Sequence, residues 1–162
     1  MGLIDSRVAN LEDLQLQHWS QGSSFESRSA RIGPALGAQN LGYSYDVVPP
    51  GKRSCPFHNH RGQEEMFLIL RGSGTLRYGS ETRTVRAGDV ICCPVGGPET
   101  AHQIVNDSND DLAYLSVSTM MPAEVCEYPD SKKVGAYGGV TPSRLRHMTR
   151  LDAHVDYWTD EA

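Results

Sequence analysis

Three histidines and one glutamate carry the chemistry that this sequence suggests. His58-Asn59-His60 places two imidazoles two residues apart, a spacing that puts both on one face of a β-strand. Glu65 begins an apolar run, with Glu64 beside it on the opposite face. The two faces of that run are equally apolar, so parity alone does not choose between the two glutamates. His102 follows one hairpin and one strand later, a return that brings a barrel chain back to the same interior.

These residue types suit a first-row divalent metal ion. Neutral imidazole is a good donor to such an ion, and one carboxylate lowers the charge of the site from +2 to about +1. One or two coordination positions then stay open for water or substrate. A site of this kind can hold and polarise an anionic or enediol-like ligand.

Two longer patterns surround these residues. The stretch Gly51…His58-x-His60-x4-Glu65-x6-Gly72 resembles the first sequence motif of the cupin superfamily, and Gly88-x5-Pro94-x-Gly96…His102-x3-Asn106 resembles the second. The spacing departs from the family pattern in two places. Between Gly51 and His58 there is one residue more than the family has, and the loop from Gly96 to His102 is longer than usual.

The resemblance implies an all-β fold, a cupin-type jelly-roll β-barrel (double-stranded β-helix), with a metal held by three histidines and one glutamate. In the family the glutamate stands seven positions before the final glycine of the first motif, which selects Glu65. It implies one divalent transition metal (Zn, Mn, Fe or Ni) and identifies no separate catalytic residue. By residue match the metal ligands are His58, His60, Glu65 and His102.

Cupins include isomerases, dioxygenases, decarboxylases, storage proteins and sensors, so the fold does not give the function. The chain looks like the small single-domain cupins of the sugar-phosphate-isomerase-like group. We therefore expect a metal-dependent enzyme that acts on a small oxygen-rich substrate by enediolate chemistry. Two alternatives stay open: an Fe(II)-dependent dioxygenase of a small enolisable acid, and a non-catalytic small-molecule-binding or sensor cupin.

Length and charge exclude other classes. A chain of 162 residues makes about one domain. With 15 Lys+Arg against 20 Asp+Glu, the net charge of −5 argues against a nucleic-acid partner. No apolar run approaches the roughly 20 residues of a membrane span, and no secretory signal is expected at residues 1–24. The cysteines at positions 55, 92, 93 and 126 form no C-x-x-C pair, so we expect reduced thiols and a cytoplasmic protein.

Short alternating runs between turn signals predict a β-sandwich or barrel. The sequence divides into an N-terminal arm (1–24), a cupin β-barrel (25–120) and a C-terminal extension (121–162) that packs on the barrel or on a dimer partner. Strands are predicted at 25–32, 41–48, 66–70, 75–78, 82–86, 90–93, 102–106 and 112–118.

The C-terminal extension has a less definite pattern. Apolar residues recur there at spacings of three and four, which fits a short amphipathic helix or an extended arm. The pair Tyr157-Trp158 indicates packing against the barrel or a second subunit. Exposed barrel edges and this apolar tail together predict a homodimer. The spaced residues are Leu145, Met148, Leu151, Val155 and Trp158.

Overall fold

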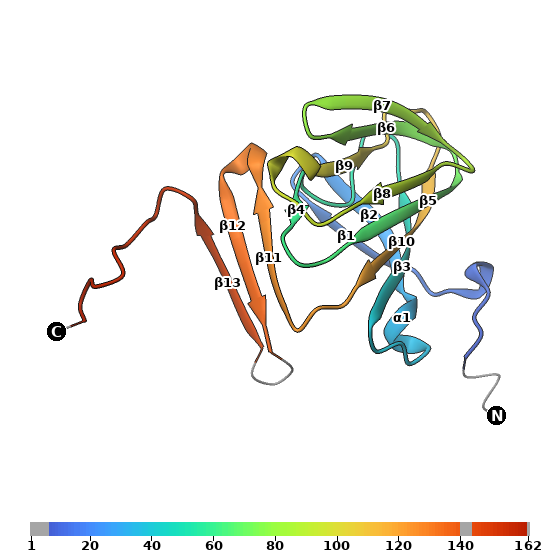
Figure 1. Cartoon of the computed structure of the whole chain (residues 1–162). Coiled ribbons are helices and arrows are strands. Elements are labelled where there is room, and N and C mark those ends of the chain that lie inside the picture. Colours follow the sequence, from blue (N-terminus) through green and yellow to red (C-terminus); the bar gives the residue numbers. More distant parts are fainter. Residues whose placement is uncertain (1–6, 140–143, 162) are drawn as a thin grey trace.

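The computed structural model describes residues 7–139 and 144–161, and its regular structure is almost entirely β-strand (Figure 1). The helical elements are α1 (Ile32–Ala35) and three short 3-10 turns, Leu11–Asp13, Pro98–Thr100 and Pro129–Ser131. The strands are β1 (Gln17–Gln21), β2 (Phe25–Arg31), β3 (Leu41–Val48), β4 (Asn59–His60), β5 (Glu65–Arg71), β6 (Ser73–Tyr78), β7 (Glu81–Arg86), β8 (Val90–Cys93), β9 (His102–Val105), β10 (Leu112–Thr119), β11 (Ala123–Tyr128), β12 (Lys133–Gly138) and β13 (Leu145–Arg150). None of the helices in the described ranges is long and apolar enough to cross a membrane.

The all-β jelly-roll prediction is confirmed, and all eight predicted strands are present. β3 and β8 begin and end at the predicted residues, and the other six differ by one or two residues at their ends. The barrel consists of a sheet ordered β1-β2-β3-β10-β5-β8 facing a smaller sheet ordered β7-β6-β9. Alternate residues of both sheets point inward, as the two-residue period of a strand requires. They form one apolar core of Val48, Phe67, Ile69, Leu76, Val85, Ile91, Cys93, Ile104, Leu112 and Tyr114.

A tight turn between β5 and β6 lets the two sheets meet. Gly72 has φ 80° there, the left-handed region that favours glycine. A side chain at this position would place its Cβ 2.5 Å from the carbonyl oxygen of Asp111. The final glycine of the first motif is therefore required by both backbone conformation and space.

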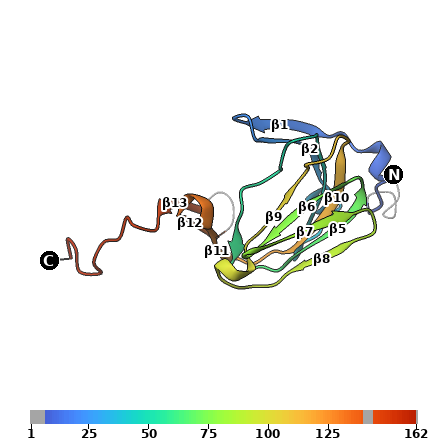
Figure 2. The same ribbon diagram turned by 90° about the horizontal axis from the view of Figure 1, so that it is seen from above.

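The chain after the barrel forms a second sheet, ordered β13-β12-β11-β4. β11 joins it to the barrel, because Cys126 pairs with His60 and Glu127 with Asn59. The sequence left open a helix or an extended arm over residues 145–158, and the structure has strand β13 there, followed by a tail of turns and irregular backbone. Seen from above, this sheet lies beside the barrel and the tail runs away from both (Figure 2). At the other end of the chain, β1 pairs with β2.

Candidate metal centre

Three strands bring the predicted site residues together. His58 and His102 form a backbone bridge: the His58 N–H donates to the His102 carbonyl (3.2 Å) and the His102 N–H to the His58 carbonyl (2.8 Å). His60 follows on β4 with the same parity as His58, so both imidazoles turn inward. Glu65, at the start of β5, turns toward them. Glu64 is exposed, and its backbone N–H donates to the Thr119 hydroxyl instead.

The three imidazoles converge on one carboxylate oxygen. Glu65 Oε2 lies 3.1 Å from His102 Nε2, 3.4 Å from His60 Nε2 and 3.8 Å from His58 Nε2. All four potential ligand atoms lie within 4.8 Å of one another. The side chains are largely buried, with between 3% and 18% of their surface exposed. The structure therefore gathers all four predicted residues into one cluster.

The outer nitrogens of two rings are held by backbone carbonyls. His58 Nδ1 lies 2.8 Å from the Pro56 oxygen and His102 Nδ1 lies 3.1 Å from the Thr100 oxygen. A carbonyl only accepts, so each Nδ1 carries the proton and each Nε2 in the neutral ring keeps a free lone pair. This is the tautomer that a metal-ligating histidine needs.

His60 is arranged differently, and its partners come from β11. Its Nδ1 lies 3.3 Å from the Cys126 sulfur and 3.4 Å from Glu124 Oε1. Its Nε2 is buried and makes no hydrogen bond within the described part of the chain. A buried polar atom without a hydrogen bond costs free energy unless something else binds it. A divalent ion between the three Nε2 atoms and Glu65 would bind this nitrogen, so the donor set fits such an ion.

The cluster shifts the pKa values of two of its members. Burial opposes ionisation of Glu65, but the close contact with the His102 ring and the interactions with His60 outweigh it and hold the carboxyl pKa well below its usual range. Burial likewise lowers the pKa of His60, yet its contacts with Cys126 and Glu65 are stronger and raise it to about 9. Without a metal, the site therefore pairs a carboxylate with an imidazolium.

The motifs did not reveal the β11 residues. Glu124 is 6% exposed and accepts a hydrogen bond from the Arg61 backbone N–H at 3.1 Å in addition to its contact with His60. Cys126 is also buried. The only sequence signal was the alternation of Glu124, Cys126 and Tyr128, which marks one face of a strand but does not say what that face covers. The link to His60 depends on the pairing of β11 with β4.

Asn59 lies between the two histidines, on the opposite face of the strand. Its side chain does point away from the cluster, but β11 covers it and Asn59 is fully buried. Its Nδ2 donates to the Gly96 carbonyl (3.0 Å) and to Glu127 Oε2 (2.9 Å). The glutamate also pairs with Arg61. Asn59 therefore ties the ligand strand to the C-terminal sheet and to the long loop after Gly96.

Aromatic rings surround the rest of the cluster. Tyr128 stacks on His58 with ring centroids 6.1 Å apart, and Phe67 meets His102 edge-on at 5.7 Å. Among the described residues, no lysine or arginine forms a hydrogen bond or ion pair with the four clustered side chains. Apart from the imidazoles, the Glu65 carboxylate is therefore the only charged group in the four-residue cluster.

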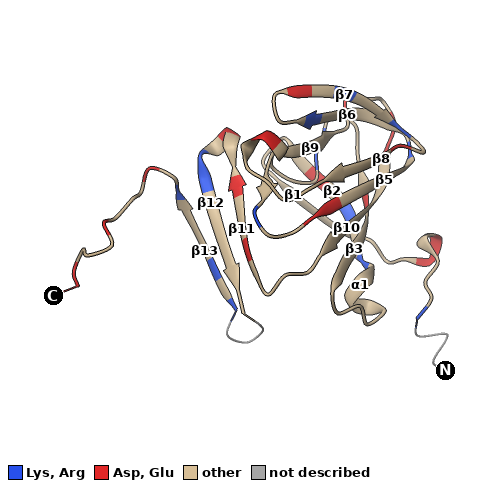
Figure 3. Cartoon of the chain, in the orientation of Figure 1, with Lys and Arg blue, Asp and Glu red and all other residues tan. Residues whose placement is uncertain are grey.

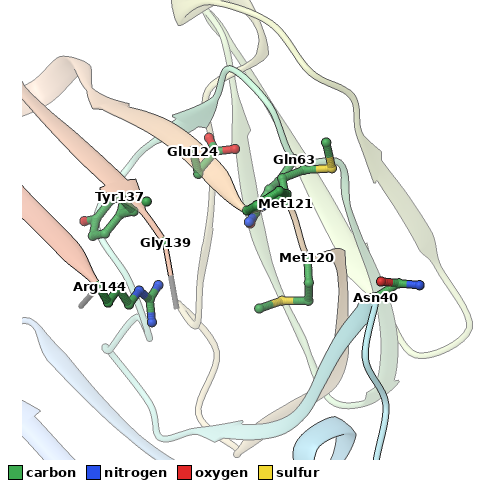
Figure 4. Close-up of a pocket in the computed structure, with 10 residues that line it drawn as sticks. Asn40, Gln63, Met120, Met121, Glu124, Tyr137, Gly139 and Arg144 are labelled. Carbon is green, nitrogen blue, oxygen red and sulfur yellow. The ribbon is translucent and has the colours of Figure 1, made fainter. Parts of the chain in front are cut away.

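A cleft of about 520 Å³ opens between the end of the barrel and the C-terminal sheet (Figure 4). Met120 and Met121 line one side, and Tyr137 and Arg144 line the other. Glu124 belongs to the wall of this cleft and also contacts His60. The cleft therefore reaches the residue that holds one of the clustered imidazoles.

Comparison with known sequences finds a family model described as "Cupin domain" that matches residues 44–118. The oxalate-binding protein of Thermotoga maritima is 34% identical over 74 residues, which cover 46% of this chain and 58% of that protein. Auxin-binding protein 1 of Arabidopsis thaliana is 35% identical over 131 residues, 76% of this chain and 64% of that protein. In both cases the match spans less than two thirds of the relative.

Two solved structures share the fold over almost the whole chain. One is a candidate sugar phosphate isomerase from Acidithiobacillus ferrooxidans, with a TM-score of 0.82, 21% identity, and coverage of 94% of this chain and 98% of that one. The other is a sugar phosphate isomerase from Silicibacter pomeroyi, with a TM-score of 0.76, 22% identity, and coverage of 91% and 96%. At these identities the likeness concerns the fold alone.

Proposed function

The chain belongs to the cupin superfamily, with its cupin domain at residues 44–118, and from that premise we propose a metal-dependent protein that acts on a small oxygen-rich molecule. The convergence of three histidine Nε2 atoms on one carboxylate oxygen carries the proposal. In it the ion is a single divalent transition metal, bound by His58, His60, Glu65 and His102.

The arrangement of protons supports this ligand set. Two of the imidazoles have their protons fixed on the outer nitrogen by carbonyls, and the third has a buried Nε2 without a hydrogen bond among the described residues. Glu65 is ionised at neutral pH because its pKa is held low. Such an ion would supply a Lewis acid that polarises a substrate oxygen. The protein's own part is to hold the donors and to exclude water with Tyr128 and Phe67.

Isomerisation of a sugar or sugar phosphate through an enediolate is the activity we propose first. The fold likeness to the two structures described as sugar phosphate isomerases supports it. No lysine or arginine among the described residues bonds to the cluster, so no such side chain next to the ion neutralises a phosphate. Unphosphorylated aldoses and ketoses should therefore be assayed beside their phosphates.

Binding of a small acid without turnover is the second candidate. The match to the oxalate-binding protein of Thermotoga maritima favours it. A dicarboxylate of that size could bind an ion through two oxygens and needs no general base from the protein. A stable complex with unchanged oxalate would support this candidate over the isomerase.

The first test is metal content, measured by mass spectrometry on untagged protein purified without chelator. We expect close to one equivalent in the wild type and a large loss in His58→Ala and His102→Ala, each still folded by circular dichroism. Arg83→Ala, an exposed change on β7, is the matched control. No metal in the wild type after reconstitution, or full metal in either histidine variant, would overturn the proposal.

The identity of the metal directs the second test. Zinc, manganese or nickel leads to assays of sugar isomerisation by NMR, with oxalate binding measured by calorimetry in parallel. Iron leads to oxygen-uptake assays with small enolisable acids, the dioxygenase alternative. Conversion of a sugar by the wild type, lost in His102→Ala, would establish the isomerase. Oxalate binding without conversion of any sugar or acid would favour the binding protein.

We further propose that the protein is a cytoplasmic homodimer. All four cysteines are free thiols in the structure, which suits a reducing compartment. Exposed apolar side chains concentrate in the C-terminal sheet and tail, which suits pairing with a second subunit.

A further inference from the structure

The C-terminal tail, residues 151–161, leaves the body of the protein (Figures 1 and 2), and its large apolar side chains are exposed. Val155 is 73% exposed, Tyr157 80% and Trp158 71%. The two aromatic rings contact each other edge-on with centroids 4.8 Å apart. An exposed apolar group of this size is unfavourable unless another surface covers it.

The tail and the strand before it have opposite charge. The tail holds four acidic residues and no lysine or arginine, whereas β12 and β13 hold basic residues and no acidic ones (Figure 3). The acidic residues are Asp152, Asp156, Asp160 and Glu161, and the basic ones are Lys133, Arg146 and Arg150. A surface complementary to the tail is therefore present on the same chain.

Within residues 7–139 and 144–161, the acidic tail contacts the basic sheet only directly after β13. Arg150 Nε lies 3.5 Å from Asp152 Oδ1, directly after the strand. The Leu151 N–H donates to the Lys132 carbonyl at 2.9 Å, and beyond this point the tail departs from the sheet. Within the described residues, the Asp156 carboxylate accepts one hydrogen bond, from the Trp158 backbone N–H. Arg146 also makes no ion pair within the described residues.

β13 also has a free edge. It is the terminal strand of its sheet, paired only with β12 among the described strands. Leu145 and Met148 on this strand are 58% and 42% exposed. An exposed edge with apolar side chains is a ready surface for another extended segment.

We propose that the acidic tail of one copy docks along the basic β13 edge of a second copy, and that the second copy returns the same contact. Residues 151–161 reach about 35 Å when extended, enough to follow the roughly 20 Å of a six-residue strand. Tyr157 and Trp158 would cover Leu145 and Met148, while acidic side chains meet Arg146 and Arg150. Because each copy places its tail on the other, the two copies form a closed two-fold dimer. It specifies the surface of the homodimer proposed above and is independent of the metal chemistry.

The test is a charge exchange on the full chain, read as mass by analytical ultracentrifugation. We expect a wild-type dimer whose Kd rises about a hundredfold in the tail variant Asp156→Lys/Glu161→Lys, and likewise in the strand variant Arg146→Glu/Arg150→Glu. Combining all four changes should restore the dimer, because each contact again joins opposite charges. Glu12→Lys/Glu81→Lys, away from the tail and β13, makes the same change of net charge as the tail variant and should remain dimeric.

Three results would overturn the inference. They are a monomeric wild type, a dimer insensitive to the tail variant, and a combined variant that stays monomeric although each half dissociates. Metal content, measured on the same samples, should equal that of the wild type throughout. This readout separates failure of the interface from failure of the metal site.

Discussion

Glu124 is placed to fix the orientation of the His60 ring. Its buried carboxylate approaches His60 Nδ1 and is itself held by the Arg61 backbone N–H. A carboxylate behind a ligating histidine sets the tautomer and increases the basicity of the ring. We therefore expect Glu124 to act on the site through His60, as a positioning residue.

Replacing Glu124 with leucine should weaken metal binding by about 10–100-fold, the usual cost of losing such a partner. Glu124→Gln keeps an oxygen acceptor and should lose less. Affinity is measured by titrating metal-free protein with Co²⁺, whose absorption spectrum also reports ligand geometry. Glu81→Gln, an exposed change on β7, removes the same charge away from the site and serves as the control. Equal affinities in all variants would contradict the role.

The stability of the metal-free protein should depend on pH in a defined window. The folded-state pKa of His60 is raised from 6.5 to about 9, so its contribution is complete below about pH 6.5 and is lost as pH rises through 9. The pKa of Glu65 is lowered from 4.5, so its contribution is present above that value and is lost as pH falls. Urea midpoints should therefore decline between about pH 6.5 and 9. His60→Gln should flatten that decline; an unchanged slope would refute the assignment.

At the level of single residues, sequence patterns identified the four clustered residues but missed Glu124 and Cys126. Ligand types at fixed spacing are visible in a sequence because the chemistry requires them. The partners behind His60 depend on which strand pairs with β4, and β11 lies more than sixty residues further along the chain. Nothing in the local sequence encodes that pairing.

Among the elements, the turn between β5 and β6 is the most constrained. Gly72→Ala combines left-handed backbone strain with a Cβ 2.5 Å from a carbonyl oxygen, and should cost about 3 kcal/mol. Gly51 has φ 75°, but a Cβ added there would meet no atom within 4 Å, so Gly51→Ala should cost only about 1–2 kcal/mol. Urea unfolding of both variants checks the difference. Equal losses would mean that space at Gly72 contributes nothing.

The strands that were predicted and those that were missed differ in what they bury. β3 alternates apolar and polar residues and β8 is a short apolar run, and both lie between clear turn signals, so their ends were predicted correctly. β11 buries Glu124 and Cys126 while Val125 is 38% exposed, which reverses the usual pattern. β13 is exposed along its length, and its apolar spacing of three also fits a helix. Hydrophobic periodicity cannot identify a strand whose inward face is polar or whose two faces are both open.

For the molecule as a whole, a bound metal should stabilise the folded state. The donors come from separate strands and meet only in the barrel, so an ion that binds there stabilises the native state by mass action. At a hundredfold excess over Kd the gain is about 2.7 kcal/mol. Thermal unfolding with and without the metal measures it. His102→Ala should show no gain, and a shift equal to the wild type's would mean the ion binds elsewhere.

The bridge between His58 and His102 also sets an order of events during synthesis. The first two imidazoles leave the ribosome about 40 residues ahead of His102, which at about 5–20 residues/s is a delay of a few seconds. For most of that interval the nascent chain offers the two imidazoles and the Glu65 carboxylate without His102, a partial set that discriminates poorly among cellular ions. For the proposed metal site, selection of the ion would therefore fall to the closed barrel, and a wrongly acquired ion would have to be exchanged after folding.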